Sequence, residues 1–126
     1  MIFHQGAKKT IYFTDHGETS LEVAEEHVPS NQNCGAQFRR LLSRLGDIGK
    51  LNSPEQLRNE GNGIFAVKTR CGLRAYGWFC NDPTTNAPLF VVGHCAYKKK
   101  DKANPLDLER AIEERNNFHG ITLWQQ

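Results

Sequence analysis

The segment from residue 63 to residue 118 constrains the fold more than any other part of the chain. Two strand-like runs are joined by a turn around Cys71 and Gly72, and a third run, apolar on both faces, follows a loop rich in Asn and Pro. The expected strands cover residues 64–70, 73–80 and 89–97. Asn104 as N-cap and Pro105 at the first position then predict the start of a helix.

The first half of the chain predicts a strand over residues 10–14 and one or two helical turns at 21–26. A helix is expected over residues 36–45, because apolar side chains recur there at helical spacing, and Gly46 is expected to end it. The apolar positions of this helix are Phe38, Leu41, Leu42 and Leu45.

A second, short helix is expected from Ser53 to about residue 61, since Ser53, Pro54 and Gln56 have the pattern of a capping box. The predicted order is therefore strand, helix, helix, three strands, helix. This order indicates an α+β fold, in which helices pack on a mainly antiparallel sheet of about four strands.

Length and composition indicate a single domain over residues 1–126. The chain has 126 residues, of which 38% are apolar, enough for one core. Its formal charge of +2 is small, and the charge is distributed in two clusters, Arg39 with Arg40 and Arg44, and Lys98 to Lys102. Such blocks of charge are more often solvated faces than binding sites. The amino terminus lacks the apolar core of a signal peptide, and no apolar run reaches the ~20 residues of a membrane span. We therefore expect a cytoplasmic protein with no membrane partner.

The four cysteines are scattered and form no C-x-x-C pair. We expect free thiols that act as small apolar residues, because a disulfide framework is typical of secreted proteins. A zinc site formed by these cysteines and His94 is the alternative, although ligand pairs at the spacing of a zinc turn are missing. The cysteines are Cys34, Cys71, Cys80 and Cys95.

The turn between the first two strands of the 63–118 segment determines which side chains share a face. A three-residue loop with Gly72 in the left-handed position of a bulge pairs Lys68 with Arg74. This register separates an apolar face from a face with Lys68, Arg74, Tyr76 and Trp78, whereas a two-residue loop would mix them. Because like charges directly opposite each other destabilise a sheet, the pair indicates that an anion binds there.

The chain resembles the RelE/HigB-type toxin superfamily, in particular its phage-derived branch, in the order of its elements and in four short motifs. These motifs are Lys68 with Arg70, the run Leu73-Arg74-Ala75-Tyr76, the run His94-Cys95-Ala96-Tyr97-Lys98-Lys99, and Pro105 with Ala111 and Arg115. The resemblance implies a compact α+β toxin fold and cleavage of mRNA in the ribosomal A site. It also implies a cognate antitoxin protein as a partner, beside mRNA and the ribosome.

Metal-independent RNA cleavage is chemically consistent with these residues, so we expect no cofactor and no metal. A 2′-hydroxyl can attack the adjacent phosphate if its proton is removed and the developing negative charge is stabilised by fixed cations. Arg74 fits the second requirement, because its guanidinium is always charged and forks onto phosphate. Lys68 could assist or act as the base, and Lys99 could protonate the leaving group.

The remaining candidates supply acid–base or binding groups. Tyr76 and His94 are candidate general acid–base or base-stacking groups, and each also fits a purely structural role. Arg70 could bind RNA or pair with a glutamate of the last helix. The residues expected to bind RNA are Arg70, Lys98, Lys100 and Lys102.

Two other classes of function remain open on the sequence. A non-catalytic phage or prophage protein could use the same basic face to bind RNA or a protein. A small metal-binding module would need the cysteines to cluster. The enzyme would need Arg74, Lys68 and one acid–base group to converge.

Overall fold

The protein has an α+β fold built on one six-stranded mixed sheet, in a computed structural model that describes residues 1–30, 33–98 and 103–121. The strand order is β1-β2-β6-β5-β4-β3, with β2 parallel to β6 and every other pair antiparallel. The strands are β1 (Ile2–Gln5), β2 (Thr10–Phe13), β3 (Leu57–Gly61), β4 (Ile64–Lys68), β5 (Leu73–Asn81) and β6 (Pro88–Tyr97). The α+β class is confirmed, whereas the expected sheet of about four strands lacked β1 and β3, which form its two edges.

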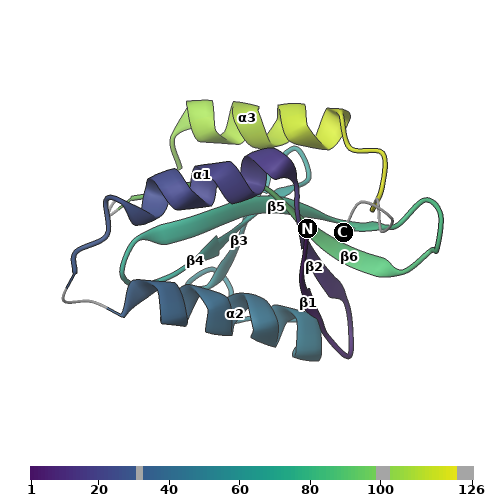
Figure 1. Cartoon of the computed structure of the whole chain (residues 1–126), viewed down its shortest axis with the longest axis horizontal. Helices are drawn as coiled ribbons and strands as arrows, with labels where there is room; N and C mark the ends of the chain where they lie inside the picture. Colours follow the sequence, from purple (N-terminus) through teal and green to yellow (C-terminus); the bar gives the residue numbers. More distant parts are fainter. Residues whose placement is uncertain (31–32, 99–102, 122–126) are drawn as a thin grey trace.

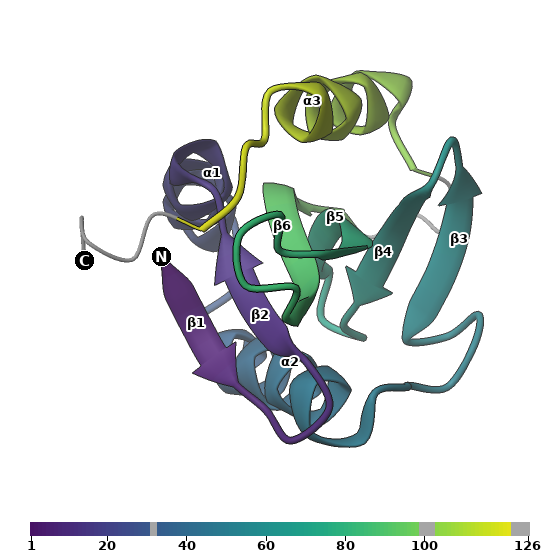
Figure 2. The same cartoon turned by 90° about the vertical axis from the view of Figure 1, so that its right-hand side faces the viewer.

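Three helices pack around the sheet: α1 (Asp15–Glu25), α2 (Cys34–Ile48) and α3 (Pro105–Asn116). Figure 1 shows α3 on one side of the sheet and α2 on the other, and Figure 2 shows the same layers after a quarter turn. α1 runs along β6 beyond the point where β2 ends, and the backbone N–H of Cys95 there donates to Ser20 Oγ (2.8 Å).

The two sides of the sheet have separate apolar cores. On the α2 side, Phe38, Leu42 and Leu45 are buried among strand residues that include Val67 and Leu73. On the α3 side, the buried residues are Ile64, Ala66, Tyr76, Trp78, Leu89, Val91, Ala103 and Ala111. Successive side chains of a strand point to opposite faces of the sheet, so the strand residues alternate between the two cores. Neither face of the central strands is therefore open to solvent.

The predicted register of the β4–β5 hairpin is confirmed. Lys68 lies opposite Arg74, and the Thr69 N–H donates to the Leu73 carbonyl oxygen (3.0 Å) across the turn. Gly72 has φ +115°, which L side chains rarely adopt, so glycine is required at this position of the bulge.

The expected helix over residues 53–61 is wrong, because Leu57–Gly61 forms the edge strand β3 and pairs with β4. The capping-box pattern has a real counterpart: Gln56 Oε1 accepts a hydrogen bond from the Asn52 N–H (3.1 Å). That bond closes a turn instead of starting a helix, and the chain then becomes extended.

The bounds of the two earlier helices also differ from expectation. One or two helical turns were expected at residues 21–26, but α1 begins six residues earlier, at Asp15. The Thr14 side chain caps it there by accepting a hydrogen bond from the Gly17 N–H (3.0 Å). α2 does not end at Gly46, because the turn between β1 and β2 packs against that glycine. The N–H groups of Lys8 and Lys9 both donate to its carbonyl oxygen (2.9 Å each). The helix ends instead at Gly49, which has φ +88°.

The expectation of four free thiols is wrong for two of the cysteines. Cys34 and Cys71 form a disulfide, while Cys80 and Cys95 are free. The fold brings the start of α2 to the β4–β5 turn, with 5.6 Å between the two Cα atoms, a separation that suits a disulfide. Within the described residues, no helix is both long and apolar enough to cross a membrane.

Candidate nucleic-acid interface

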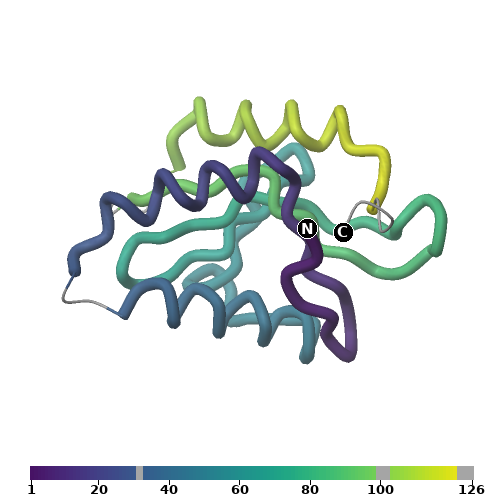
Figure 3. Tube along the Cα trace, in the orientation of Figure 1, coloured from purple at the N-terminus to yellow at the C-terminus, as the bar shows by residue number. Residues whose placement is uncertain are grey.

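A groove of about 1080 Å³ lies between α2, the segment that leads from α2 to β3, and the β4–β5 turn. The turn and the start of α2 lie side by side along the Cα trace (Figure 3), as the disulfide between them requires. The lining residues are Asn33, Gln37, Arg40, Leu41, Arg44, Asn52, Glu55, Gln56, Lys68, Thr69, Arg70 and Cys71.

The charged side chains that line this groove are mostly cationic. Arg40 and Arg44 come from α2, Lys68 and Arg70 come from the β4–β5 hairpin, and Glu55 is the carboxylate among the lining residues. We call the groove with these four cations the basic groove. The three arginines are exposed and Lys68 is half-buried, so their charges face solvent. A concave surface lined with one sign of charge attracts polyanions, and arginine forks match phosphate oxygens.

The two sequence-predicted residues in the basic groove are Lys68 and Arg70. Lys98 lies near its hairpin wall, because the Lys98 N–H donates to the Gly72 carbonyl oxygen (2.7 Å). The predicted residues Lys99, Lys100 and Lys102 lie outside the described residues. The sequence had shown Arg40 and Arg44 as a charge cluster, but it held no sign that α2 would pack beside the hairpin.

Arg74 and Tyr76 lie on the sheet face that α3 covers, and both are buried. Arg74 is 4% exposed and Tyr76 is fully buried. Burial raises the pKa of the Tyr76 hydroxyl, and the neighbouring Arg74 side chain partly offsets that effect. The sheet face was expected to present both side chains to an anion, whereas here only Lys68 of that row reaches the groove.

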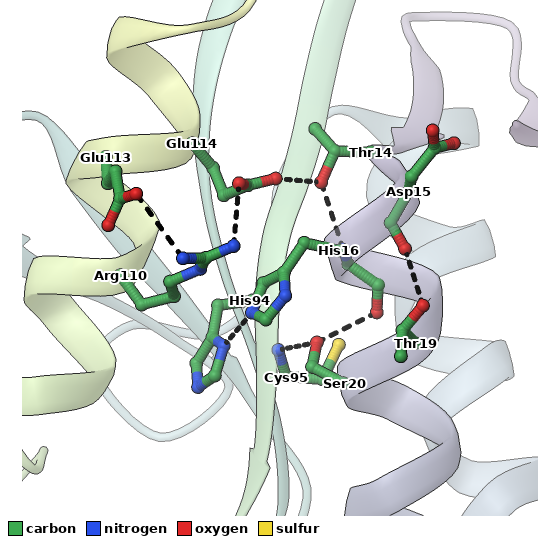
Figure 4. Close-up of polar contacts among 11 residues, drawn as sticks. Thr14, Asp15, His16, Thr19, Ser20, His94, Cys95, Arg110, Glu113 and Glu114 are labelled. Atoms are coloured by element: carbon green, nitrogen blue, oxygen red, sulfur yellow. Dashed lines mark hydrogen bonds and ion pairs between the residues drawn. The ribbon is translucent and has the colours of Figure 1, made fainter.

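His94 belongs to a separate group of titratable side chains, which we call the histidine cluster: His16, His94 and Asp107. His16 Nε2 and His94 Nδ1 are 2.9 Å apart, and His94 Nε2 is 2.9 Å from Asp107 Oδ1. The two imidazole rings stack with centroids 5.1 Å apart (Figure 4), and the centroid of the Tyr76 ring is 6.4 Å from that of His94. The cluster joins α1, β6 and α3.

One assignment of protons satisfies the three ring nitrogens that make these contacts. If His94 donates from Nε2 to the Asp107 carboxylate, its Nδ1 is an acceptor, and His16 donates to it from Nε2. His16 is then left with an unprotonated Nδ1. Burial lowers the pKa of His16, and the positive charge of Arg110 adds to the effect, which favours this neutral form.

An acidic pair on α3 completes the surroundings of the histidine cluster. Arg110 bridges Glu113 and Glu114 at 3.4 Å each, and Glu114 Oε1 accepts from the Thr14 hydroxyl (2.8 Å), as Figure 4 shows. The sequence analysis missed His16, which lies 78 residues from its partner and has no motif of its own. The described residues contain no group of three or more His, Cys, Asp or Glu side chains arranged to hold a metal ion.

Lys68, Arg70 and Lys98 therefore lie near the basic groove, whereas Tyr76 and His94 lie on the α3 side of the sheet. The two free cysteines, Cys80 and Cys95, do not join the Cys34–Cys71 pair. The chain matches no protein-family model, no curated protein and no solved structure.

Proposed function

We propose that this protein binds the RNA backbone in the basic groove and cleaves mRNA as the toxin of a type II toxin–antitoxin pair. The observation that carries the proposal is the grouping of Arg40, Arg44, Lys68 and Arg70 around one groove, where Glu55 is the one carboxylate among the described lining residues. The partners proposed with it are mRNA, the ribosome and a cognate antitoxin in the cytoplasm. The activity proposed is a metal-independent, ribosome-dependent endoribonuclease that inhibits translation.

The order of elements supports the proposed RelE/HigB-like fold. β2, α1, α2, β4, β5, β6 and α3 follow one another as strand, helix, helix, three strands and helix, with α1 as the first helix and no helix over residues 53–61, where one was expected. The two strands beyond this pattern, β1 and β3, are added at the two edges of the sheet and leave its centre unchanged.

The groove supports RNA as the polyanion because its cations come from two rigid elements. Arg40 and Arg44 are one helical turn apart on α2, so they present a row of charge along the groove. Lys68 is held on the facing wall, where its N–H donates to the Gln56 carbonyl oxygen (2.9 Å). Fixed cations of this kind position a phosphodiester backbone without reading its sequence.

The proposed cleavage step needs no redox partner and no metal. The 2′-oxygen of one nucleotide forms a bond to the adjacent phosphorus, and the bond from phosphorus to the 5′-oxygen breaks. A base takes the proton of the 2′-hydroxyl, and an acid protonates the leaving 5′-oxygen, so that a 2′,3′-cyclic phosphate remains. Lys68, which lines the groove, is proposed to stabilise the phosphorane, with Lys98 or Lys99 as the acid, whereas Arg74 is buried on the sheet face that α3 covers and is not proposed to touch the phosphate.

Expression in bacteria tests the proposal, with growth and primer extension on a translated message as readouts. The native chain is expected to arrest growth and to give codon-linked cuts that survive EDTA. Lys68→Gln removes the groove cation that is proposed to act on the phosphorane, so it should reduce cleavage far more than RNA affinity. Arg39→Lys, on the same helix as the groove arginines, is the control and should leave cleavage unchanged. A folded native chain that neither cuts nor arrests growth contradicts the enzyme.

The burial of Arg74 and Tyr76 favours one other function, a non-catalytic phage or prophage protein that binds RNA through the same groove. Such a protein needs only the basic groove and no acid–base group near it. It would bind RNA, and the variants Arg40→Gln and Arg44→Gln would lose that affinity. It would give no cuts in any translated message. Binding without cleavage therefore selects this function over the toxin.

A further inference from the structure

The Cys34–Cys71 disulfide joins the two walls of the basic groove. Cys34 is the first residue of α2, the helix that supplies Arg40 and Arg44. Cys71 lies in the β4–β5 turn next to Arg70, and it lines the groove itself. The bond spans 37 positions of the sequence, so the backbone between its ends fixes no distance between the walls.

Both cysteines belong to the apolar core on the α2 side, and the described polar neighbour of their sulfur atoms is Thr69 of the hairpin. Thr69 Oγ1 lies 3.0 Å from Cys71 Sγ and 3.9 Å from Cys34 Sγ, and its hydroxyl donates to the Leu73 carbonyl oxygen (2.8 Å). Between this turn and the start of α2, the described links are thus the covalent disulfide and the 3.9 Å contact of Thr69 Oγ1 with Cys34 Sγ. Breaking the disulfide would remove the covalent link between the turn and the helix.

The position of Cys34 makes the bond chemically reducible. A thiolate at Cys34 would lie at the N-terminus of a fifteen-residue helix, whose first turn contains no acidic side chain. The positive end of the helix dipole favours a thiolate at Cys34, so Cys34 is the better leaving group of the two. Both cysteines are buried, with Cys71 at 5% and Cys34 at 1% exposed, so attack on Cys71 by an incoming thiolate requires the β4–β5 turn to open.

We infer that the Cys34–Cys71 disulfide is a redox-sensitive latch that sets the shape of the basic groove and, on the basis of the proposed function, its affinity for RNA. A thiolate of a dithiol reductant attacks Cys71 Sγ, and Cys34 leaves as a thiolate. The second thiol of the reductant then releases Cys71 and forms the reductant's own disulfide, so that two electrons pass to the protein. In a reducing compartment, protein disulfides are typically transient and regulatory, which fits a latch better than a permanent staple.

The experiment compares the oxidised and dithiothreitol-reduced protein by hydrogen exchange and by RNA binding. Reduction should raise exchange in the turn of residues 69–72 and in the first turn of α2, with no change in the α3 side of the sheet. Affinity for a short single-stranded RNA should fall by about fivefold or more, the usual size of coupling between two states. The double variant Cys34→Ser plus Cys71→Ser should have the exchange rates and RNA affinity of the reduced protein, and dithiothreitol should change neither. The control, Cys80→Ser, should respond to dithiothreitol as the native protein does.

The outcomes separate this inference from the proposed function. Four titratable thiols in the unreduced protein, or equal exchange in both states, overturn the latch. Equal RNA affinity in both states, with RNA bound through the groove arginines, overturns the redox control and leaves RNA binding standing. A change in exchange with no RNA bound in either state shows a redox-sensitive groove and contradicts RNA as its ligand.

Discussion

Lys68 and Arg74 lie directly opposite each other on β4 and β5, so two cationic side chains share one cross-strand position. Like charges in this relationship destabilise a sheet by an amount on the order of 0.2–1 kcal/mol, the range of cross-strand pairs. Arg74 is buried on the α3 side, and Lys68 reaches the rim of the basic groove. The pair therefore joins a buried cation to an exposed binding surface.

Replacing Lys68 by methionine should separate binding from stability. The variant Lys68→Met keeps an unbranched side chain of similar length, and it removes the like-charge repulsion with Arg74. The free energy of unfolding in urea should stay the same or rise by up to about 1 kcal/mol, while RNA affinity falls. A destabilised variant with unchanged RNA affinity would show that Lys68 is a structural residue and not a ligand-binding one.

Gly72 should tolerate no larger residue without a loss of stability. A Cβ at this position would lie 2.8 Å from Tyr97 Cε1 and 2.9 Å from the Lys98 carbonyl oxygen, in addition to the strain at φ +115°. Gly61 has a similar φ of +92° with nothing within 4 Å, so Gly61→Ala measures the strain alone. In urea unfolding, Gly72→Ala should lose about 1–3 kcal/mol more than Gly61→Ala, the typical cost of overpacking. Equal losses would contradict the tight packing of the bulge.

Leu42 should be essential to the core on the α2 side of the sheet. It is fully buried with Phe38 and Leu45, so Leu42→Ala should lower the free energy of unfolding by about 2–5 kcal/mol. Arg39→Ala, an exposed change on the same helix, should stay within about 0.5 kcal/mol of the native protein. A Leu42→Ala variant as stable as Arg39→Ala would contradict the packing of α2 on the sheet.

His16 should make the protein less stable on mild acidification. Burial and the charge of Arg110 lower its pKa below the ordinary value of 6.5 in the folded protein, although the carboxylates of Glu114 and Glu113 oppose this. The unfolded chain therefore binds the proton first, and stability falls as the pH drops from 6.5 towards the lowered pKa. His16→Gln should flatten this part of the curve, whereas His27→Gln, at an exposed position, should not. If stability fell equally steeply with pH in the native protein and in His16→Gln, the proposed role of His16 in acid destabilisation would be wrong.

The centre of the fold was predictable because local signals and burial agree there. The register of the β4–β5 hairpin followed from Gly72 and from the need to separate apolar from cationic side chains. The start of α3 followed from Asn104, whose side chain does accept from the Leu106 N–H (2.9 Å). Both features depend on residues close together in the sequence.

The parts that sequence reasoning missed depend on distant partners. β3 is a strand because it pairs with β4, and its polar sequence LRNEG has no strand-like pattern of its own. The disulfide and the His16–His94 contact join residues 37 and 78 positions apart, which spacing alone does not identify. The burial of Arg74 was missed because the hairpin pattern identified which residues share a face, but not that α3 covers it.

The salt dependence of RNA binding tests the central claim, that the basic groove holds an RNA backbone, most directly. The measurement compares the native protein with Arg40→Gln plus Arg44→Gln, and with Arg39→Gln as the matched control, because Arg39 is an exposed cation of α2 that does not line the groove. Each lost phosphate contact should reduce the slope of log affinity against log salt for a single-stranded RNA by about 0.7. We predict a fall of about 1.4 in that slope for the double variant, two such contacts, and no change for Arg39→Gln. Equal slopes for all three proteins would contradict the claim.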